Sequence, residues 1–212
     1  QRTPVQVGGG HKFRSVTVGR WHSCGVATDD RAYCWGDNRY GQLGDSVAFT
    51  SRAAPFRVAG GRFYKWLEAG NQFNCGVTTA GKAFCWGNGR VGQLGNGKTY
   101  LSFWPRAVSG GVVFRNIAAG AAHACGVATD GQEWCWGANT SGQLGDGTTT
   151  PRLAPWKSAT GVAIAKVAGG GDFTCGLTGA GKAWCWGNNA AGQVGDGTTI
   201  TPRLTPRAVV GP

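Results

Sequence analysis

The sequence predicts an all-β protein in which four repeated units each fold as a four-stranded blade of a β-propeller. One segment occurs four times, at residues 24–46, 75–97, 125–147 and 175–197. In each copy two cysteines stand ten positions apart, the second precedes Trp-Gly, and a Gly-Gln-Leu/Val-Gly turn follows. The 39 glycines and the 15% of charged residues favour short strands and tight turns. Repeats of about fifty residues with four strands each are typical of propeller blades.

Each unit begins with a strand in which apolar and polar residues alternate before a glycine, at residues 13–19, 63–70, 114–120 and 163–170. Each unit ends with a proline-containing strand, which must lie at a sheet edge or begin at the proline because proline lacks an amide hydrogen. We therefore expect one repeat domain over residues 1–212. Its blades are expected at about 8–58, 59–108, 109–158 and 159–210, with an extra Pro-x-x-Val strand at residues 3–7.

The two cysteines of each copy belong to a β-hairpin. Thr129-Asp130-Gly131 has the form of a three-residue hairpin loop, and counting outward from it sets Cys125 opposite Cys135. Facing residues at this distance from the loop occupy a non-hydrogen-bonded pair, where a disulfide fits best. The predicted bridges are Cys24–Cys34, Cys75–Cys85, Cys125–Cys135 and Cys175–Cys185. Nine intervening residues do not match a zinc-binding pair, so we expect no metal and no cofactor.

Paired cysteines favour an oxidising compartment, so a secreted or extracellular protein is expected. The absence of methionine agrees with a processed chain that begins at Gln1. No run approaches the ~20 apolar residues of a membrane span. The net charge of +11 favours acidic partners, although scattered basic residues also serve solubility, and the sequence leaves both interpretations open.

Aromatic and arginine residues that break the repeat are candidate anchors for a partner, because these types are enriched at protein interfaces. Aromatic rings also suit sugars or nucleobases. The tryptophans after each second cysteine are instead assigned to the core, at positions 35, 86, 136 and 186. Asn139 starts a glycosylation sequon, which matters only in a eukaryotic protein. The candidate partner-binding residues are Arg20, Trp21, Arg39, Tyr40, Tyr64, Trp66, Tyr100, Phe103, Trp104 and Trp156.

Catalytic chemistry is not expected. His22 and His123 alternate with Phe73 and Phe173 at one repeat position, so we expect each histidine to fill a structural slot and bond to backbone. No Ser-His-Asp, Cys-His or paired-carboxylate arrangement lies outside the periodic positions. The alternation also indicates that a pair of blades was duplicated. We therefore predict a protein that is not an enzyme.

The segment CGVATDGQEWCWGANTSGQLGDG, with AAGAAHA before it and TTTPRLAP after it, resembles the repeat of the regulator of chromosome condensation family. The resemblance covers essentially the whole chain and implies a β-propeller. Propellers of this family usually have seven blades, whereas four repeats are present here. The paired cysteines are similar to those of secreted bacterial-type members, some of which inhibit β-lactamases by covering the active-site mouth.

The resemblance implies a secreted module that binds another protein or further copies of itself. Binding of acidic polysaccharide or other polyanions through the basic surface is the alternative. Guanine-nucleotide exchange is a remote alternative, because paired cysteines do not fit a reducing nucleus, and nucleic acid is not expected as a partner.

Overall fold

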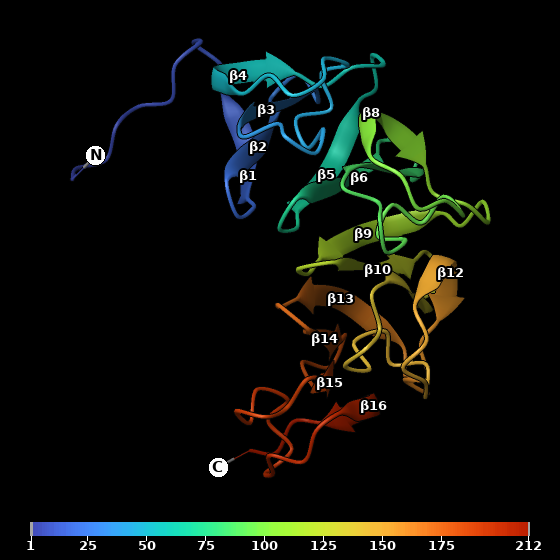
Figure 1. The fold of residues 1–212 in the computed structure, drawn as a ribbon. Coiled ribbons are helices and arrows are strands. Elements are labelled where there is room, and N and C mark those ends of the chain that lie inside the picture. The colour runs from blue at the N-terminus through green and yellow to red at the C-terminus, as the bar shows by residue number, and fades with distance from the viewer. Residues whose placement is uncertain (1, 212) are drawn as a thin grey trace.

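The computed structural model describes residues 2–211, so Gln1, the expected start of the processed chain, lies outside the described residues. It contains 16 strands in four antiparallel sheets of four strands, which are the blades (Figure 1). Within the described range no helix is long and apolar enough to cross a membrane. Each blade pairs its strands in chain order, so no strand is exchanged between blades.

The blades take consecutive strands. Blade 1 contains β1 (Phe13–Val18), β2 (His22–Ala27), β3 (Ala32–Gly36) and β4 (Arg52–Arg57). Blade 2 contains β5 (Tyr64–Ala69), β6 (Phe73–Thr78), β7 (Ala83–Gly87) and β8 (Ser102–Ala107). Blade 3 contains β9 (Phe114–Ala119), β10 (His123–Ala128), β11 (Glu133–Gly137) and β12 (Arg152–Lys157). Blade 4 contains β13 (Ile164–Gly169), β14 (Phe173–Thr178), β15 (Ala183–Gly187) and β16 (Arg203–Ala208).

The blades follow one another in an open array, with blade 1 at one end and blade 4 at the other (Figure 1). The inner strands β1, β5, β9 and β13 contact one another in succession. Extensive strand contacts between blades join only successive blades among residues 2–211. The fold is therefore an unclosed series of propeller blades.

The predicted hairpin disulfides are confirmed. Each pair of cysteines faces across the second and third strands of its blade, and the Cα atoms lie 4.1 Å apart in all four bridges. Gly81, Gly131 and Gly181 adopt positive φ at the hairpin loops, and Asp30 takes that conformation in blade 1 with φ 65°. The loop geometry read from the sequence therefore sets the cysteine register.

The expected extra strand at residues 3–7 is wrong. These residues are exposed and form no strand, and they lead away from the body of the molecule (Figure 1). In each blade the proline-containing strand pairs with the third strand of the same blade, as β4 pairs with β3. Within the described chain no third strand precedes β1, so residues 3–7 have no edge to join.

The tryptophan after the second cysteine joins each blade to the one before it. In blades 2 to 4 this side chain is fully buried, and its indole N–H donates to a carbonyl in the Gly-Gln-Leu-Gly turn of the preceding blade. The distance is 3.0 Å for Trp86 to Gln42, Trp136 to Gln93 and Trp186 to Gln143. Trp35, also assigned to the core, is only half-buried because no blade covers it.

The histidines fill a structural slot, as expected, but they do not bond to backbone. His22 Nε2 lies 3.1 Å from Asn74 Oδ1, and His123 Nε2 lies 2.8 Å from Thr174 Oγ1, so each contact crosses to the next blade. Burial lowers the pKa of His123 to about 4, which keeps the imidazole neutral near pH 7. The histidines therefore connect blades and do not form part of a catalytic set.

Replacing Gly95 with alanine tests how closely the blades approach. A Cβ atom at Gly95 would lie 2.7 Å from Trp136 Nε1, and φ there is +63°. Gly97 has a similar φ of +76° with nothing within 4 Å, so Gly97→Ala measures backbone strain alone. We expect Gly97→Ala to cost about 1 kcal/mol and Gly95→Ala a further ~1–3 kcal/mol of unfolding free energy, measured by urea denaturation of the oxidised protein. Equal losses would contradict this close packing.

Candidate functional site

Two connections of every blade lie at the same end of the sheet. Because neighbouring strands are antiparallel, the turn after the first strand and the long loop after the third strand both leave from that end. In blade 1 these are residues 19–21 and 37–51, and in blade 2 they are residues 70–72 and 88–101. We call this end of the four blades the loop face. Loops on a rigid scaffold are where binding residues concentrate.

The loop face of blades 1 and 2 carries residues that blades 3 and 4 lack. Arg20-Trp21 of blade 1 corresponds to Ala121-Ala122 in blade 3 and to Gly171-Asp172 in blade 4. In the long loops, Arg39-Tyr40 and Arg90-Val91 of the first two blades correspond to Thr140-Ser141 and Ala190-Ala191. The same backbone frame thus presents arginine and large apolar side chains at one half of the array only.

These side chains lie in contact with solvent. Trp21 is 61% exposed, and the Arg20 guanidinium lies 5.8 Å from the centre of its ring. The Arg90 guanidinium lies 6.0 Å from the Tyr40 ring, so the surface continues from blade 1 to blade 2. Tyr100 is also exposed, and its hydroxyl accepts a hydrogen bond of 3.2 Å from an asparagine amide of the same loop. The structure therefore brings five of the predicted residues to one end of the molecule.

Positive charge dominates this surface. Arg39 is paired, because its Nε donates to Asp37 Oδ1 over 2.9 Å. Arg20, Arg90 and Lys98 form no salt bridge with any residue in the described range. Arg90 and Lys98 are not among the predicted partner-binding residues, although comparison of the loops of the four copies reveals both. Unpaired cations beside exposed apolar groups favour binding of a partner whose surface is anionic and also offers apolar contacts.

Other predicted anchors lie elsewhere. Tyr64 is a core residue, only 1% exposed, and its ring packs on Trp86 with the ring centres 6.0 Å apart. Phe103 packs against Gly41 of the neighbouring blade and lies 5.3 Å from the ring of Phe49, so its role is in the junction. The assignment of Tyr64 as a surface anchor is wrong, because its ring fills space between blades. The assignment of the half-buried Phe103 stays a prediction.

Trp66 and Trp104 are exposed but do not belong to the loop face. Trp66 lies on the inner strand β5, where its indole N–H donates to Glu68 Oε1 over 3.1 Å. Trp104 lies on the outer strand β8. The accessible rings predicted from the sequence therefore lie on three separate surfaces.

Trp156 borders a small apolar cavity on the rim of blade 3. The cavity has a volume of about 310 Å³ and is lined by Trp134, Trp156 and Lys157. The Lys157 ammonium lies 5.2 Å from the Trp134 ring, whereas Arg152, stacked 4.4 Å from the Trp156 ring, is neutralised by Asp146 at 2.7 Å. This arrangement offers aromatic faces and one free positive charge to a ligand.

The expected glycosylation site at Asn139 is wrong for the folded chain. Asn139 is fully buried, and its Nδ2 donates to Asp146 Oδ1 at 3.2 Å and to the carbonyls of Thr148 and Thr150 at 3.0 and 3.1 Å. Asn189 makes equivalent bonds in blade 4, so the asparagine is a periodic element of the turn. Ser141 completes the sequon by coincidence with this structural role.

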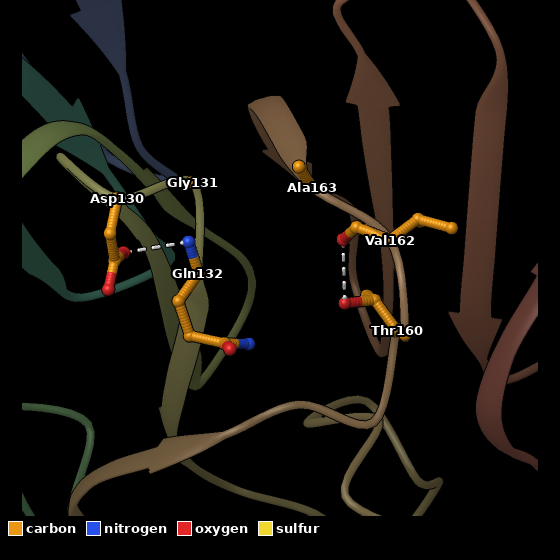
Figure 2. Close-up of a pocket in the computed structure, with 7 residues that line it drawn as sticks. Asp130, Gly131, Gln132, Thr160, Val162 and Ala163 are labelled. Atoms are coloured by element: carbon orange, nitrogen blue, oxygen red, sulfur yellow. Dashed lines mark hydrogen bonds between the residues drawn. The ribbon is translucent and has the colours of Figure 1, made fainter.

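A second hollow lies at the opposite end of the blades, between the hairpin tip of blade 3 and the segment that enters blade 4 (Figure 2). Its volume is about 340 Å³. Its polar side chains bond within their own loops: Asp130 Oδ1 accepts from the amide of Gln132 at 2.9 Å, and Thr160 Oγ1 donates to the Val162 carbonyl at 3.2 Å. These groups do not converge on a common point, so the hollow has no reactive arrangement.

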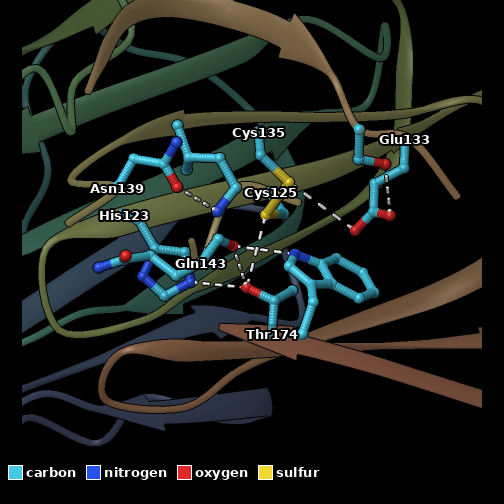
Figure 3. The surroundings of a disulfide bond; sticks show 10 residues. His123, Cys125, Glu133, Cys135, Asn139, Gln143 and Thr174 are labelled. Atoms are coloured by element: carbon cyan, nitrogen blue, oxygen red, sulfur yellow. Dashed lines mark hydrogen bonds between the residues drawn. A yellow bond between two sulfur atoms is a disulfide. The ribbon is translucent and has the colours of Figure 1, made fainter. Parts of the chain in front are cut away.

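A buried carboxyl lies beside one disulfide (Figure 3). Glu133 occupies a position that is alanine in the other three blades, and Ser158 one that is valine there. Glu133 Oε2 accepts from Ser158 Oγ at 3.0 Å, and Oε1 lies 3.8 Å from Cys135 Sγ. Burial raises the pKa of Glu133 to about 8. The group resembles a metal site only in composition, because the Cys125–Cys135 disulfide leaves no thiolate to coordinate an ion.

Comparison with known families places these features in context. Two models of the regulator of chromosome condensation (RCC1) repeat match the chain. One matches residues 29–77, 80–127 and 130–177, and the other residues 13–42, 114–143 and 164–193. Together the matched segments include the cysteine hairpins of all four blades.

Curated relatives are similar over part of the chain. The probable E3 ubiquitin-protein ligase HERC3 of Homo sapiens is 37% identical over 38% of this chain, which is 8% of the ligase. The ultraviolet-B receptor UVR8 of Arabidopsis thaliana is 33% identical over 44% of this chain and 21% of the receptor. The chain thus matches only a small part of each of these proteins.

Solved structures share the fold over the whole chain. Yeast RCC1 (Prp20), in its complex with Kap60, has a TM-score of 0.87 at 21% identity and covers 100% of this chain with 52% of its own. Human WBSCR16 has a TM-score of 0.83 at 24% identity and covers 92% of this chain with 51% of its own. The chain spans about half the length of each of these propellers.

Restoring the alanine and valine of the other blades, by Glu133→Ala with Ser158→Val, tests the buried carboxyl. The folded state keeps the proton up to about pH 8, whereas the ordinary pKa is 4.5, so the unfolding free energy of the parent should fall as pH rises between these values. The loss is about 1.4 kcal/mol per pH unit. The double variant should lack this slope and be more stable at pH 8, as measured by urea unfolding at several pH values. Ser158→Val alone should destabilise, and an unchanged slope in the double variant would contradict the assignment.

Proposed function

The chain belongs to the regulator of chromosome condensation repeat family, and we propose that it is a secreted protein-binding module whose contact surface is the loop face of blades 1 and 2. The observation that carries this proposal is the asymmetry of the loops. Arginine, tryptophan and tyrosine stand where blades 3 and 4 have alanine, glycine, serine, threonine or aspartate. A scaffold role alone does not require this difference, because blades 3 and 4 fold without these side chains.

The chemistry of the surface defines the partner. Exposed Trp21 and half-buried Tyr40 provide flat apolar contact area with few rotatable bonds, and arginine provides planar donors for carboxylates. The partner is therefore a protein with an acidic patch around an apolar centre. A related propeller supports a protein partner, since yeast RCC1 (Prp20) forms a complex with Kap60.

Secretion is part of the proposal. Four disulfides, one in each blade, are compatible with an extracellular protein, and all eight cysteines are paired. Disulfides of this kind persist in oxidising compartments and are reduced in the cytosol. The partner is accordingly sought among extracellular proteins.

A second candidate function is binding of an acidic glycan, and the cavity of Trp134, Trp156 and Lys157 favours it. Small-ligand sites are mostly apolar or aromatic, with a few polar groups that fix orientation. The free ammonium of Lys157 would face the carboxylate of an acidic sugar, while a tryptophan face would cover its ring. The net charge of +11 would attract such a polyanion.

The loop face is tested by copying into blade 1 the residues of blade 3. The variant carries Arg20→Ala, Trp21→Ala, Arg39→Thr and Tyr40→Ser, all of which the same frame already accommodates. Affinity capture from the extracellular protein fraction, followed by titration of the captured protein, should give binding at least about ten-fold weaker than the parent, about 1.4 kcal/mol or more.

The matched control is Thr140→Ala with Ser141→Ala, which copies blade 4 into blade 3 by the same kind of exchange. This control should bind as the parent does. Equal binding by the blade 1 variant and the parent would overturn the assignment of the loop face, and equal weakening by both variants would show that the effect is not specific to this surface.

Binding of an oligogalacturonide, an acidic sugar probe, tests the second candidate. Trp156→Ala should abolish binding, while Trp104→Ala removes an equally exposed outer-strand tryptophan from blade 2 and should leave it intact. Calorimetry at low and moderate salt should show weaker binding of the parent as salt rises, because the ion pair with Lys157 is screened. An affinity for the oligogalacturonide that changes neither with salt nor in Trp156→Ala would exclude this site.

A further inference from the structure

Two sheet faces of the open array have no blade packed against them among residues 2–211. We call the side of blade 1 turned away from blade 2 the first face, with Phe13, Val16, Ser23 and Trp35. Val16 is 66% exposed, whereas the equivalent Leu67 and Ile117 of blades 2 and 3 are 5% and 1% exposed. The first face therefore presents a surface that the later blades bury.

The opposite surface is the last face, the side of blade 4 turned away from blade 3, with Phe173, Leu177 and Gln193. Leu177 is 39% exposed, while Val77 at the same position of blade 2 is fully buried. In the described chain the Gln193 carbonyl receives no tryptophan, although the three equivalent glutamine carbonyls each accept one. Each face is half of a junction that the molecule builds three times.

The three junctions are of two kinds. Between blades 1 and 2, His22 contacts Asn74 and the Arg14 guanidinium donates to the Tyr64 carbonyl. Between blades 3 and 4 the same positions repeat this pattern, with His123 on Thr174 and Arg115 on the Ile164 carbonyl at 2.8 Å. These junctions therefore add polar side-chain contacts to the apolar clusters that they also contain.

The junction between blades 2 and 3 is apolar. Phe73 replaces the histidine and Ala124 replaces its polar partner, and both lie in one buried apolar cluster. The cluster also contains Val77, Leu94, Phe114, Ile117 and Trp136. Of the side-chain hydrogen bonds that cross between blades, this junction keeps the one from Trp136 to the Gln93 carbonyl. A phenylalanine therefore faces a small residue here, as a histidine faces a polar residue at the other two junctions.

The two free faces match the apolar kind of junction. The last face carries Phe173, as blade 2 carries Phe73, and the first face carries the small Ser23 where blade 3 has Ala124. The remaining positions agree in character. On the last face Leu177 corresponds to Val77, and on the first face Phe13, Val16 and Trp35 correspond to Phe114, Ile117 and Trp136.

We propose that the last face binds the first face of a second copy of this chain, in the geometry of the junction between blades 2 and 3. The Trp35 indole N–H would donate to the Gln193 carbonyl of the other copy, and Phe173 would pack on Ser23. Two four-bladed chains joined at both junctions form a closed ring of eight blades, within the range of known propellers. Residues 3–7 lead away from the body of the molecule (Figure 1).

This self-association uses surfaces separate from the loop face. Its test is therefore independent of the test of the proposed function. The blade 1 loop-face variant should associate as the parent does. A second copy is the expected partner because each free face carries one half of the arrangement that blades 2 and 3 form with each other. Hydrophobic area exposed at both faces would be removed from water in the same contact.

The test is the solution mass measured by light scattering over a dilution series of the oxidised chain. The parent should approach twice its 22.0 kDa at high concentration and dissociate on dilution. Ser23→Asn places against Phe173 an amide that has no histidine to pair with, so it should weaken association at least ten-fold. Adding Phe173→His recreates the pair of His22 with Asn74 and should restore association.

The control is Thr28→Asn at an exposed hairpin tip, which should associate as the parent does. Circular dichroism and a count of free thiols verify that every variant is folded and oxidised. A parent that is monomeric at every concentration would overturn the proposal. A dimer that Ser23→Asn does not weaken, or a double variant that associates no better than Ser23→Asn alone, would also overturn it.

Discussion

The hydrogen bond from a buried indole to a glutamine carbonyl of the preceding blade is the contact on which the array depends. The four sheets exchange no strand, so the relative position of the blades is set by side chains and turns alone. The indole fixes one point of each junction, and the glycine two residues after the glutamine lets the turn lie directly on the ring, as Gly95 lies on Trp136. The repeated Trp-Gly and Gly-Gln-Leu-Gly motifs thus form the two sides of one contact between blades, which we call the joint.

Inside each blade the disulfide complements this joint. A four-stranded sheet of five- and six-residue strands buries few side chains of its own, so the hairpin bridge stabilises it by restricting the unfolded chain. Each bridge closes a short loop and contributes about 2–3 kcal/mol by the chain-entropy model. Because joint and bridge secure the frame, the loops at one end are free to differ, and arginine and aromatic residues collect on blades 1 and 2.

The repeat made the frame predictable, because spacing alone gave the hairpin loops, the facing cysteines and the strands. It was less informative about where a side chain points. The sequence pattern predicts Tyr64 as a surface anchor, whereas the residue is buried. Tyr64 occupies the position of Phe13, Phe114 and Ile164, so an alignment of the inner strands predicts it in the core. The polar contacts of the histidines cross between blades, and sequence spacing carries no information on which blades touch. Glu133 with Ser158 is a paired departure that alignment of the four copies could have revealed.

The alternation of junctions makes a pair of blades the unit that repeats. A histidine facing alanine, or a phenylalanine facing asparagine, would leave a buried polar group without a partner, which costs about 1–3 kcal/mol. At every junction the two facing residues therefore match in polarity. His22 faces Asn74 between blades 1 and 2, and Phe73 faces Ala124 between blades 2 and 3. Copying two blades at once preserves every matched surface, whereas copying one creates a mismatch. The polar and apolar junctions thereby fix the order of the blades, with neighbours excluded by unpaired groups as well as selected by packing.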